Sequence, residues 1–379
     1  MVDIAHRALR WCAAAVVMVA AATGCSGATR LGSESASSRD SASADTVVAG
    51  DEFMTDVERI FEASNTGGYD NVRAVVVTVD ERPIVERYYR SSAETTSNVF
   101  SVTKTVMSML IGIALDNGDL QGLDQTLAEL LPSYADSMAP EAKSITLRQV
   151  LTMTSGLPSD LDIDPQLLAS DDWVTTILAE GPSQPPGEVF SYSSDGSHLL
   201  SAILVEATGV SVLEYARRHL FDPLGIDTKP AAEPVMRDYQ IDGYDEAGFA
   251  WPRDPEGLHT GWCCLKLTAR DMVKFGQLWL NGGIWDGTQV VSADWVAAST
   301  RPHVATGEPP ADHYGYQWWV TEADGHPAYA AVGYAGQLVE VVPALDLVVA
   351  VSSVEAPNNA AAASLMDIVS TIVAPALRT

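Results

Sequence analysis

The segment that most constrains the fold of this chain is Asn98–Gly118, because it contains a nearly unbroken apolar run. Within Val106–Leu115 every residue is apolar except Ser108 and the small Gly112. A helix on a protein surface needs a polar stripe, and this run has none that is wide enough. The sequence therefore predicts a helix that is buried on nearly all sides.

Two polar residues with functional potential stand at the start of this helix. Ser101 and Lys104 are three residues apart, a spacing that places both side chains on one helix face. Burial disfavours the charged form of a lysine and lowers its pKa toward the neutral amine. A neutral amine beside a serine hydroxyl can accept the hydroxyl proton. The pair therefore indicates a serine nucleophile activated by a lysine.

The alternative is that Lys104 is an ordinary first-turn residue with its amine in solvent. The chain has five lysines, so one such pair can arise by chance and the spacing alone is weak evidence. The buried character of the helix and two further segments favour the catalytic interpretation.

The second segment places a tyrosine just before another helix. Pro186-Gly187 is a turn signal, Ser197–Ala207 has helical periodicity, and Gly209 would end that helix. Tyr192-Ser193-Ser194 thus falls on a loop before the helix, and a tyrosine there could relay protons to a leaving group. A tyrosine half-buried at a turn is the alternative.

The third segment is a glycine-containing turn at the start of a hairpin. Gln337–Val342 and Leu345–Ser353 are β-rich runs around Pro343-Ala344, and Gly333–Gly336 leads into the first run. Glycines at a strand end let a ligand approach the backbone, where an N–H group could face a developing oxyanion. An ordinary glycine-rich connection is the alternative.

Together these segments resemble the serine β-lactamase-like superfamily, in its class C β-lactamase, family VIII esterase and nylon-oligomer-hydrolase-like branch. That family carries Ser-x-x-Lys, Tyr-x-Asn and Lys-Thr-Gly or a variant, in this order. They stand here as Ser101–Lys104, Tyr192–Ser194 and Tyr334–Gly336, and the resemblance covers roughly residues 52 to 379. It implies an α+β fold of the beta-lactamase/transpeptidase type, with an antiparallel sheet flanked by helices beside a helical lobe. The sequence pattern alone supports only a mixed α and β domain.

The resemblance also implies roles for individual residues. Ser101 would be the nucleophile, Lys104 the general base, and Tyr192 a partner in proton transfer to the leaving group. The backbone N–H groups of Ser101 and Gln337 would form the oxyanion hole. The remaining motif residues would contact the substrate: Ser194, Tyr334, Ala335 and Gly336.

Two residues depart from the family pattern. Ser194 replaces the usual asparagine, and its hydroxyl offers one donor where an amide offers two. Tyr334 replaces the lysine that binds the carboxylate of β-lactams and peptides. We therefore expect a serine hydrolase that acts on a small ester or amide substrate. The alternatives are a β-lactamase or D-Ala carboxypeptidase, and a non-catalytic cell-wall ligand-binding protein on the same scaffold.

The N-terminal residues read as an export signal. The apolar run Trp11–Thr23 is too short to span a bilayer, and Ala22–Cys25 resembles a bacterial lipobox that is cleaved before a lipidated Cys25. Residues 1–24 would be the signal peptide, 25–51 a Ser/Ala-rich linker and 52–379 the hydrolase domain. We expect the protein on the outer face of the cytoplasmic membrane; simple secretion and an uncleaved anchor are alternatives.

The net charge and the cysteine content limit the classes of partner and cofactor that we expect. A net charge of −28 repels nucleic acid and anionic lipid headgroups, so we expect membrane contact only through the lipid anchor. The adjacent Cys263 and Cys264 are expected to be buried thiols, because a ring between neighbours is strained. No metal or cofactor is expected. The two cysteines are not accompanied by the residue spacing of a zinc site. Pro165, after Asp160–Asp164, stands where a calcium loop needs glycine. The oligomeric state stays open.

Several secondary-structure elements are expected outside the three motif segments. The middle of the chain, Leu120 to about Gly257, should be mostly helix and loop, with His198 in a structural role. The predicted strands are Arg73–Asp80, Pro83–Tyr89, Tyr314–Val320 and Ala328–Val332, and the predicted terminal helices are Glu52–Ser64 and Asn359–Ala374.

Overall fold

The structure, a computed structural model, describes residues 71–158, 165–237, 241–307, 310–354, 365–366 and 369–374. The chain divides into two units, residues 1–48 and 49–379, and all the described residues belong to the second. The predicted signal peptide, the linker, the helix at 52–64 and the acidic Asp160–Asp164 segment lie outside the described residues.

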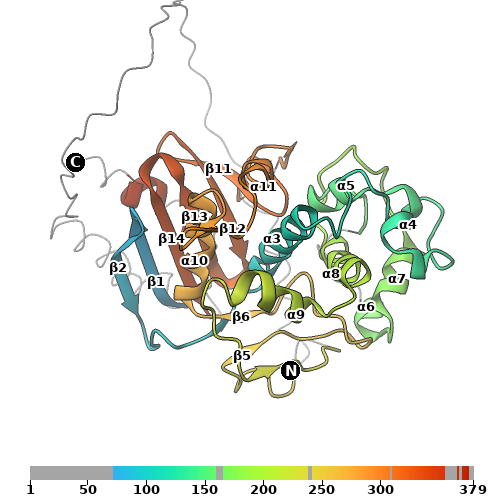
Figure 1. The fold of residues 1–379 in the computed structure, drawn as a ribbon, viewed down its shortest axis with the longest axis horizontal. Coiled ribbons are helices and arrows are strands. Elements are labelled where there is room, and N and C mark those ends of the chain that lie inside the picture. The colour runs from blue at the N-terminus through green and yellow to red at the C-terminus, as the bar shows by residue number, and fades with distance from the viewer. Residues whose placement is uncertain are drawn as a thin grey trace, which may run out of the picture. The chain divides into compact units, whose positions relative to one another are not determined.

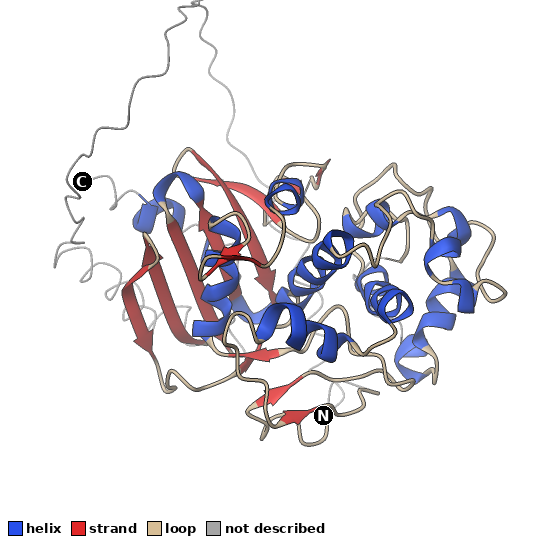
Figure 2. Ribbon diagram, viewed as in Figure 1, coloured by secondary structure: helices blue, strands red, loops and turns tan. Residues whose placement is uncertain are grey.

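An eight-stranded antiparallel sheet forms one layer of the described unit (Figures 1 and 2). Its strand order is β2-β1-β14-β13-β12-β11-β10-β9, so β1 and β14, from opposite ends of the described unit, lie side by side. The bounds are β1 Val72–Val79, β2 Arg82–Tyr88, β9 Val304–Ala305, β10 His313–Tyr314, β11 Trp319–Ala323, β12 His326–Gly333, β13 Gln337–Val342 and β14 Leu347–Ser353.

The central strands are buried on both faces. Every residue of β13 and β14 is buried. The amphipathic α10 (Ala269–Leu280) crosses one face of the sheet (Figure 1), and its Gly276 lets the helix approach closely, since a Cβ there would lie 2.3 Å from Val348. A second apolar cluster on the other face includes Leu338 and Val349, together with Val369 and Val373 of η8 (Val369–Val373).

The buried helix predicted from the apolar run is α3 (Val102–Asp116), and its residues Val102–Ala114 are all buried. In Figures 1 and 2, α3 lies between the sheet and a group of helices from the middle of the chain. These are α4 Leu127–Leu130, η3 Pro132–Tyr134, η4 Ala142–Ser144, α5 Leu147–Leu151, α6 Pro165–Ala169, α7 Trp173–Glu180, α8 Ser194–Thr208, α9 Val212–Ala216 and η5 Arg217–Phe221. The expected arrangement of an antiparallel sheet, flanking helices and a helical lobe is confirmed.

The remaining elements are short. A two-residue pairing joins β3 (Ser97–Asn98) to β6 (Lys266–Leu267), shortly before Ser101. The others are β4 Ala231–Ala232, β5 Phe249–Ala250, β7 Ile284–Trp285, β8 Thr288–Gln289, α11 Ala293–Ser299, η6 Tyr334–Gly336 and η7 Pro343–Leu345.

The predicted strands agree with the structure except in one place. The two hairpins around residues 80–83 and 343–345 are present within about two residues of their expected bounds. The expected continuous strand Tyr314–Val320 is instead split into β10 and β11, because Gln317 between them has a positive φ of 60°. Its amide is buried and donates to the carbonyls of Val150 and Leu151, which breaks the ladder in favour of a contact with α5.

No single helix within the described residues is long and apolar enough to cross a membrane. The bent pair formed by α8 and by Val212–Phe221 passes that test by length and composition only.

Candidate active site

The start of α3 brings together the serine and the lysine predicted from the sequence. Ser101 occupies the N-cap position, but its side chain makes no capping hydrogen bond, so the hydroxyl is not used to stabilise the helix end. Lys104 follows one turn later and is 1% exposed. Its Nζ lies 3.2 Å from Ser101 Oγ. The expected pairing of the two side chains is therefore present.

Two further oxygens lie close to the amine of Lys104. Nζ lies 2.9 Å from Ser194 Oγ and 3.2 Å from the backbone carbonyl oxygen of Trp262. A carbonyl can only accept, and a neutral amine has two N–H donors and one lone pair. When the N–H groups point to Trp262 and Ser194, the lone pair is directed at the Ser101 hydroxyl. This is the orientation that a base needs to take the Ser101 proton.

Tyr192 lies against this amine from the loop before α8. Lys104 Nζ is 4.7 Å from the centre of the Tyr192 ring, which stacks on Trp319 with centroids 5.7 Å apart. The loop is fixed on both sides, because Ser191 N donates to the Met153 carbonyl and the Ser193 side chain caps α8. Tyr192 therefore precedes α8 as predicted, and Ser194 is the first residue of the helix.

The third motif forms a tight turn between β12 and β13. Ala335 has a φ of 62°, and the turn is held from two sides. The buried Asn71 donates to the Ala335 carbonyl at 2.6 Å, and Ser353 Oγ donates to the Gly336 carbonyl at 3.1 Å. Gln337 opens β13 and is fully buried, with its side chain bonded to the Ser353 backbone. The backbone that carries the predicted oxyanion donor is thus held firmly.

Phe100, directly before Ser101, is a residue that sequence reasoning missed. Its ring meets Tyr334 edge to face with centroids 5.4 Å apart. Its φ is 47°, uncommon for a bulky residue, and its N–H donates to Asn98 Oδ1 at 2.8 Å. The side chain of Tyr334 is 42% exposed. A phenylalanine next to a serine carries no sequence signature, so only the positive φ and the ring contact reveal this pair.

The expectation of two free thiols at Cys263 and Cys264 is wrong, because the two residues form a disulfide. That expectation weighed only the local strain of the ring. In the folded protein Cys264 has a φ of 76°, and hydrogen bonds hold both backbone carbonyls. Thr260 Oγ1 donates to the Cys263 carbonyl at 2.7 Å, and the Tyr244 hydroxyl donates to the Cys264 carbonyl at 2.8 Å. These tertiary contacts support the turned backbone on which the sulfurs meet.

A buried histidine supports the segment that precedes the disulfide. His198 Nε2 lies 3.0 Å from Asp254 Oδ2, and both side chains are at most 1% exposed. Its Nδ1 accepts a long hydrogen bond from Gly261 N at 3.4 Å. These contacts fit a tautomer with the proton on Nε2 and the structural role expected for His198.

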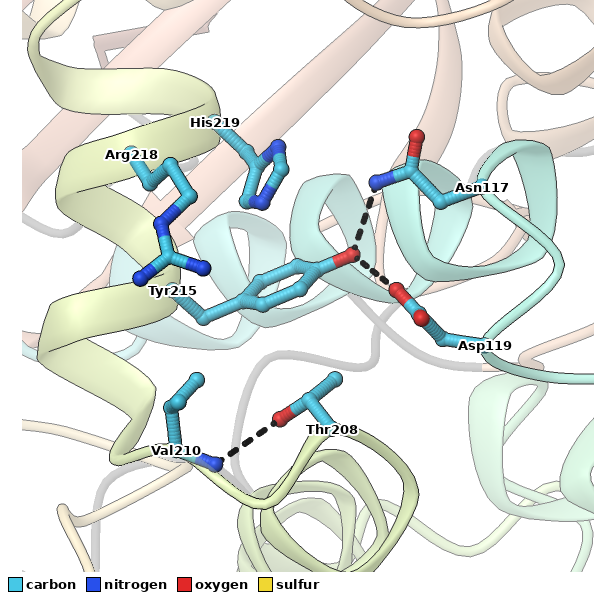
Figure 3. Close-up of a pocket in the computed structure, with 7 residues that line it drawn as sticks. All are labelled: Asn117, Asp119, Thr208, Val210, Tyr215, Arg218 and His219. Atoms are coloured by element: carbon cyan, nitrogen blue, oxygen red, sulfur yellow. Dashed lines mark hydrogen bonds between the residues drawn. The ribbon is translucent and has the colours of Figure 1, made fainter.

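A separate hollow lies at the far end of α3 (Figure 3). Its volume is about 360 Å³, and Tyr215 donates across it to Asp119 and accepts from Asn117. The lining residues are Asn117, Asp119, Thr208, Val210, Tyr215, Arg218 and His219. It contains none of the predicted catalytic residues, so it is distinct from the candidate active site.

Comparison with known proteins matches this chain to the beta-lactamase family and its relatives. The family model described as beta-lactamase matches residues 60–369. Penicillin-binding protein 4 of Amycolatopsis lactamdurans is 31% identical over 281 residues, which cover 68% of this chain and 72% of the relative. The 6-aminohexanoate-dimer hydrolase of Paenarthrobacter ureafaciens is 26% identical over 296 residues, 70% of this chain and 68% of that protein.

Among solved structures, a penicillin-binding protein homologue from Caulobacter crescentus has the same fold. It superposes with a TM-score of 0.62 at 18% identity and covers 80% of this chain and 92% of its own.

Proposed function

The chain belongs to the beta-lactamase family of serine hydrolases, and we propose that it cleaves ester or amide bonds through an acyl-enzyme on Ser101. The observation that carries the proposal is the environment of Lys104. Its amine is buried within hydrogen-bond distance of the Ser101 hydroxyl, and the Trp262 carbonyl, which can only accept, takes one of its N–H groups. Burial disfavours the charged form of a lysine, so a lysine in this position is suited to act as a base.

The proposed reaction has two halves. Lys104 takes the hydroxyl proton while Ser101 Oγ attacks the substrate carbonyl carbon. The developing oxyanion accepts hydrogen bonds from the backbone N–H groups of Ser101 and Gln337. Tyr192, beside the lysine, passes a proton to the leaving alkoxide or amine. Water then attacks the acyl-enzyme by the reverse sequence and releases the acid.

The aromatic pair beside the nucleophile favours an uncharged substrate. Tyr334 stands where the resemblance implies a carboxylate-binding lysine, and it packs edge to face on Phe100. Two aromatic side chains offer apolar contact area and one hydroxyl but no cation. We therefore propose neutral esters, and neutral amides such as those of linear oligomers, as the preferred substrates.

A penicillin-binding relative supports a second candidate, hydrolysis of β-lactams or D-Ala peptides. Purified protein should be assayed on a matched panel of p-nitrophenyl esters, anilides, cephalosporins and D-Ala-D-Ala peptides. Faster turnover of the carboxylate-bearing substrates would favour the second candidate. If no substrate is turned over while ligands bind, the protein is a binding protein on the same scaffold.

The test of the mechanism is covalent labelling. A fluorophosphonate probe should label Ser101, and Ser101→Ala should abolish both labelling and hydrolysis. Ser133→Ala, on an exposed side chain that only bonds Glu206, is the matched control and should label like wild type. Labelling at another residue, with activity retained in Ser101→Ala, would refute the mechanism.

The site of action is also a proposal. The Ala22–Cys25 motif supports export and lipid attachment at Cys25. Cys25→Ser should release the protein from the membrane fraction or block its maturation. Unchanged retention with normal processing would instead favour an uncleaved anchor.

A further inference from the structure

We infer that the Cys263–Cys264 disulfide is a redox-dependent positioning element for Lys104. The inference rests on the proposed function, in which Lys104 is the base. The disulfide touches neither Ser101 nor the substrate in this account; it acts through the carbonyl of Trp262, the residue bonded directly to Cys263.

The Trp262 carbonyl restricts how the Lys104 amine can turn. Ser101 and Ser194 present hydroxyls to Nζ that can donate or accept, whereas the Trp262 carbonyl can only accept. The carbonyl therefore requires an N–H group and removes the orientation in which the lone pair faces Trp262. The Trp262 ring adds a second contact, since Nζ lies 5.8 Å from the ring centre. With Trp262 displaced, the lone pair would gain a further orientation that points away from Ser101.

The segment around the disulfide is anchored at both ends. On one side Gly261 N donates to His198, and a Cβ on Gly261 would lie 2.4 Å from the Ser197 carbonyl oxygen, so the backbone is pressed against α8. On the other side Leu265 N donates to Thr103 Oγ1 and the Leu265 carbonyl accepts from Val99 N. Between these anchors lie only Trp262 and the two cysteines.

Between the anchors, the disulfide adds a covalent restraint to the hydrogen bonds from Thr260 and Tyr244 that hold the Cys263 and Cys264 carbonyls. Cys264 holds a φ of 76°, a left-handed conformation that residues other than glycine rarely adopt. The cross-link favours this turned backbone by restricting the alternatives. After reduction, Cys264 can relax toward an ordinary φ, and the peptide that carries the Trp262 carbonyl shifts with it.

The chemical step is a thiol–disulfide exchange with an external dithiol. One reductant thiolate attacks a sulfur of the pair, the bond between Cys263 and Cys264 breaks, and a mixed disulfide forms. The second reductant thiol closes its own disulfide, so two electrons and two protons pass to the cysteines. Because Cys263 and Cys264 are 3% and 4% exposed, attack requires a local opening and should be slow in the native protein.

The direct measurement is the titration of Lys104 in the full chain. The chain has five lysines, so NMR of protein labelled at the lysine Cε positions gives few signals, and Lys104→Arg assigns the one of interest. The Trp262 carbonyl stabilises the ammonium more than the amine. Its displacement should therefore lower the pKa of Lys104, by about one pH unit.

The kinetic measurement is the pH dependence of ester hydrolysis before and after reduction with a dithiol. In the reduced protein kcat should fall about three- to tenfold, with KM changed less than about twofold, because the base is misaligned rather than the substrate. The acidic limb should move to lower pH together with the NMR titration. Mass spectrometry after thiol alkylation verifies which cysteines are reduced.

Two double variants separate the disulfide from the backbone conformation. C263A/C264A should show the Lys104 titration and the pH–rate profile of the reduced protein. Neither should change on addition of dithiol, and this also shows that Cys12 and Cys25 are not responsible for the effect. C263A/C264G should regain much of the oxidised profile, because glycine adopts a positive φ without the cross-link. Circular dichroism verifies that each variant is folded.

The inference would be overturned if the Lys104 titration were identical in oxidised, reduced and C263A/C264A protein. It would also be overturned if Cys263 and Cys264 were free thiols in protein that has not met a reductant. Failure of the proposed function is distinguishable from either result. In that case the Lys104 titration shifts on reduction, while Ser101 neither reacts with the fluorophosphonate nor supports hydrolysis.

Discussion

Gly333 lies so close to Val99 that a Cβ on Gly333 would come within 2.4 Å of the Val99 carbonyl oxygen. This contact joins the end of β12 to the residue two positions before Ser101. It is the point where the turn of the predicted oxyanion hole meets the segment that carries the proposed nucleophile. The distance between the two parts of the site therefore depends on a residue that has no side chain.

We predict that Gly333→Ala separates these parts. A Cβ cannot fit against a backbone oxygen, so β12 or the nucleophile segment must shift, at a cost of about 1–3 kcal/mol in stability. Fluorophosphonate labelling of Ser101 should slow by about 10²-fold, since small displacements of catalytic groups carry large penalties. Gly248→Ala is the control, because nothing lies within 4 Å of a Cβ there. Equal labelling rates in the two variants would contradict the proposed oxyanion hole.

A second prediction concerns the base. Lys104→Arg should reduce kcat about as much as Lys104→Ala, by about 10²–10⁴-fold, because a guanidinium stays protonated and cannot accept the Ser101 proton. Steady-state kinetics from pH 5 to 9 measures this. Lys143→Arg, on an exposed lysine, should behave as wild type. An unchanged pH–rate profile in Lys104→Arg would exclude Lys104 as the base.

The sequence predicts the parts of the site that depend on local periodicity. The buried α3 and the Ser101–Lys104 pairing follow from the apolar run and the three-residue spacing, both visible in one segment. The order of the motifs adds Tyr192 and the turn at Tyr334. Each of these predictions needs only short-range information and a resemblance.

The missed parts depend on contacts between segments distant in sequence. The Trp262 carbonyl meets Lys104 across 158 residues, and a backbone oxygen has no sequence signature. The Cys263–Cys264 disulfide depends on tertiary support from Thr260 and Tyr244, which local strain arguments omit. The split of the expected Tyr314–Val320 strand likewise follows from the amide of Gln317 reaching α5.

A third prediction concerns stability against acid. Burial, helped by Arg253 and Arg217, lowers the pKa of His259 to about 3, below the ordinary value of 6.5. The folded protein thus holds His259 neutral, even though Glu233 lies 3.0 Å away. In the unfolded chain His259 binds a proton more readily than in the folded protein. The stability that the folded protein gains from a neutral His259 is therefore complete above pH 6.5 and declines as the pH falls toward 3.

Urea unfolding at pH 7.5 and pH 5.5 tests the size of the effect. His259 should account for a loss of about 1.4 kcal/mol between these two conditions. His259→Asn should remove that part of the difference, whereas His313→Asn, on an exposed side chain, should retain it. A pH difference as large in His259→Asn as in wild type would show that other groups are responsible.

The last prediction concerns substrate choice and follows from the ring contact between Phe100 and Tyr334. A lysine in place of Tyr334 would contact a carboxylate by charge, and such a contact is worth about one to two powers of ten in affinity. Tyr334→Lys should therefore shift the ratio of kcat/KM toward cephalosporins and away from butyryl esters.

Phe100→Ala tests the apolar half of the same pair. It should lower kcat/KM for butyryl and benzoyl esters more than for acetyl esters, because the longer acyl groups lose contact area. Val235→Ala, on a side chain 51% exposed, should leave these ratios unchanged. If wild-type protein hydrolyses cephalosporins with a higher kcat/KM than butyryl esters, the aromatic pair does not set the preference. A cation elsewhere must then bind the carboxylate, and Arg270→Ala and Arg301→Ala would identify it by a selective rise in KM for the cephalosporin.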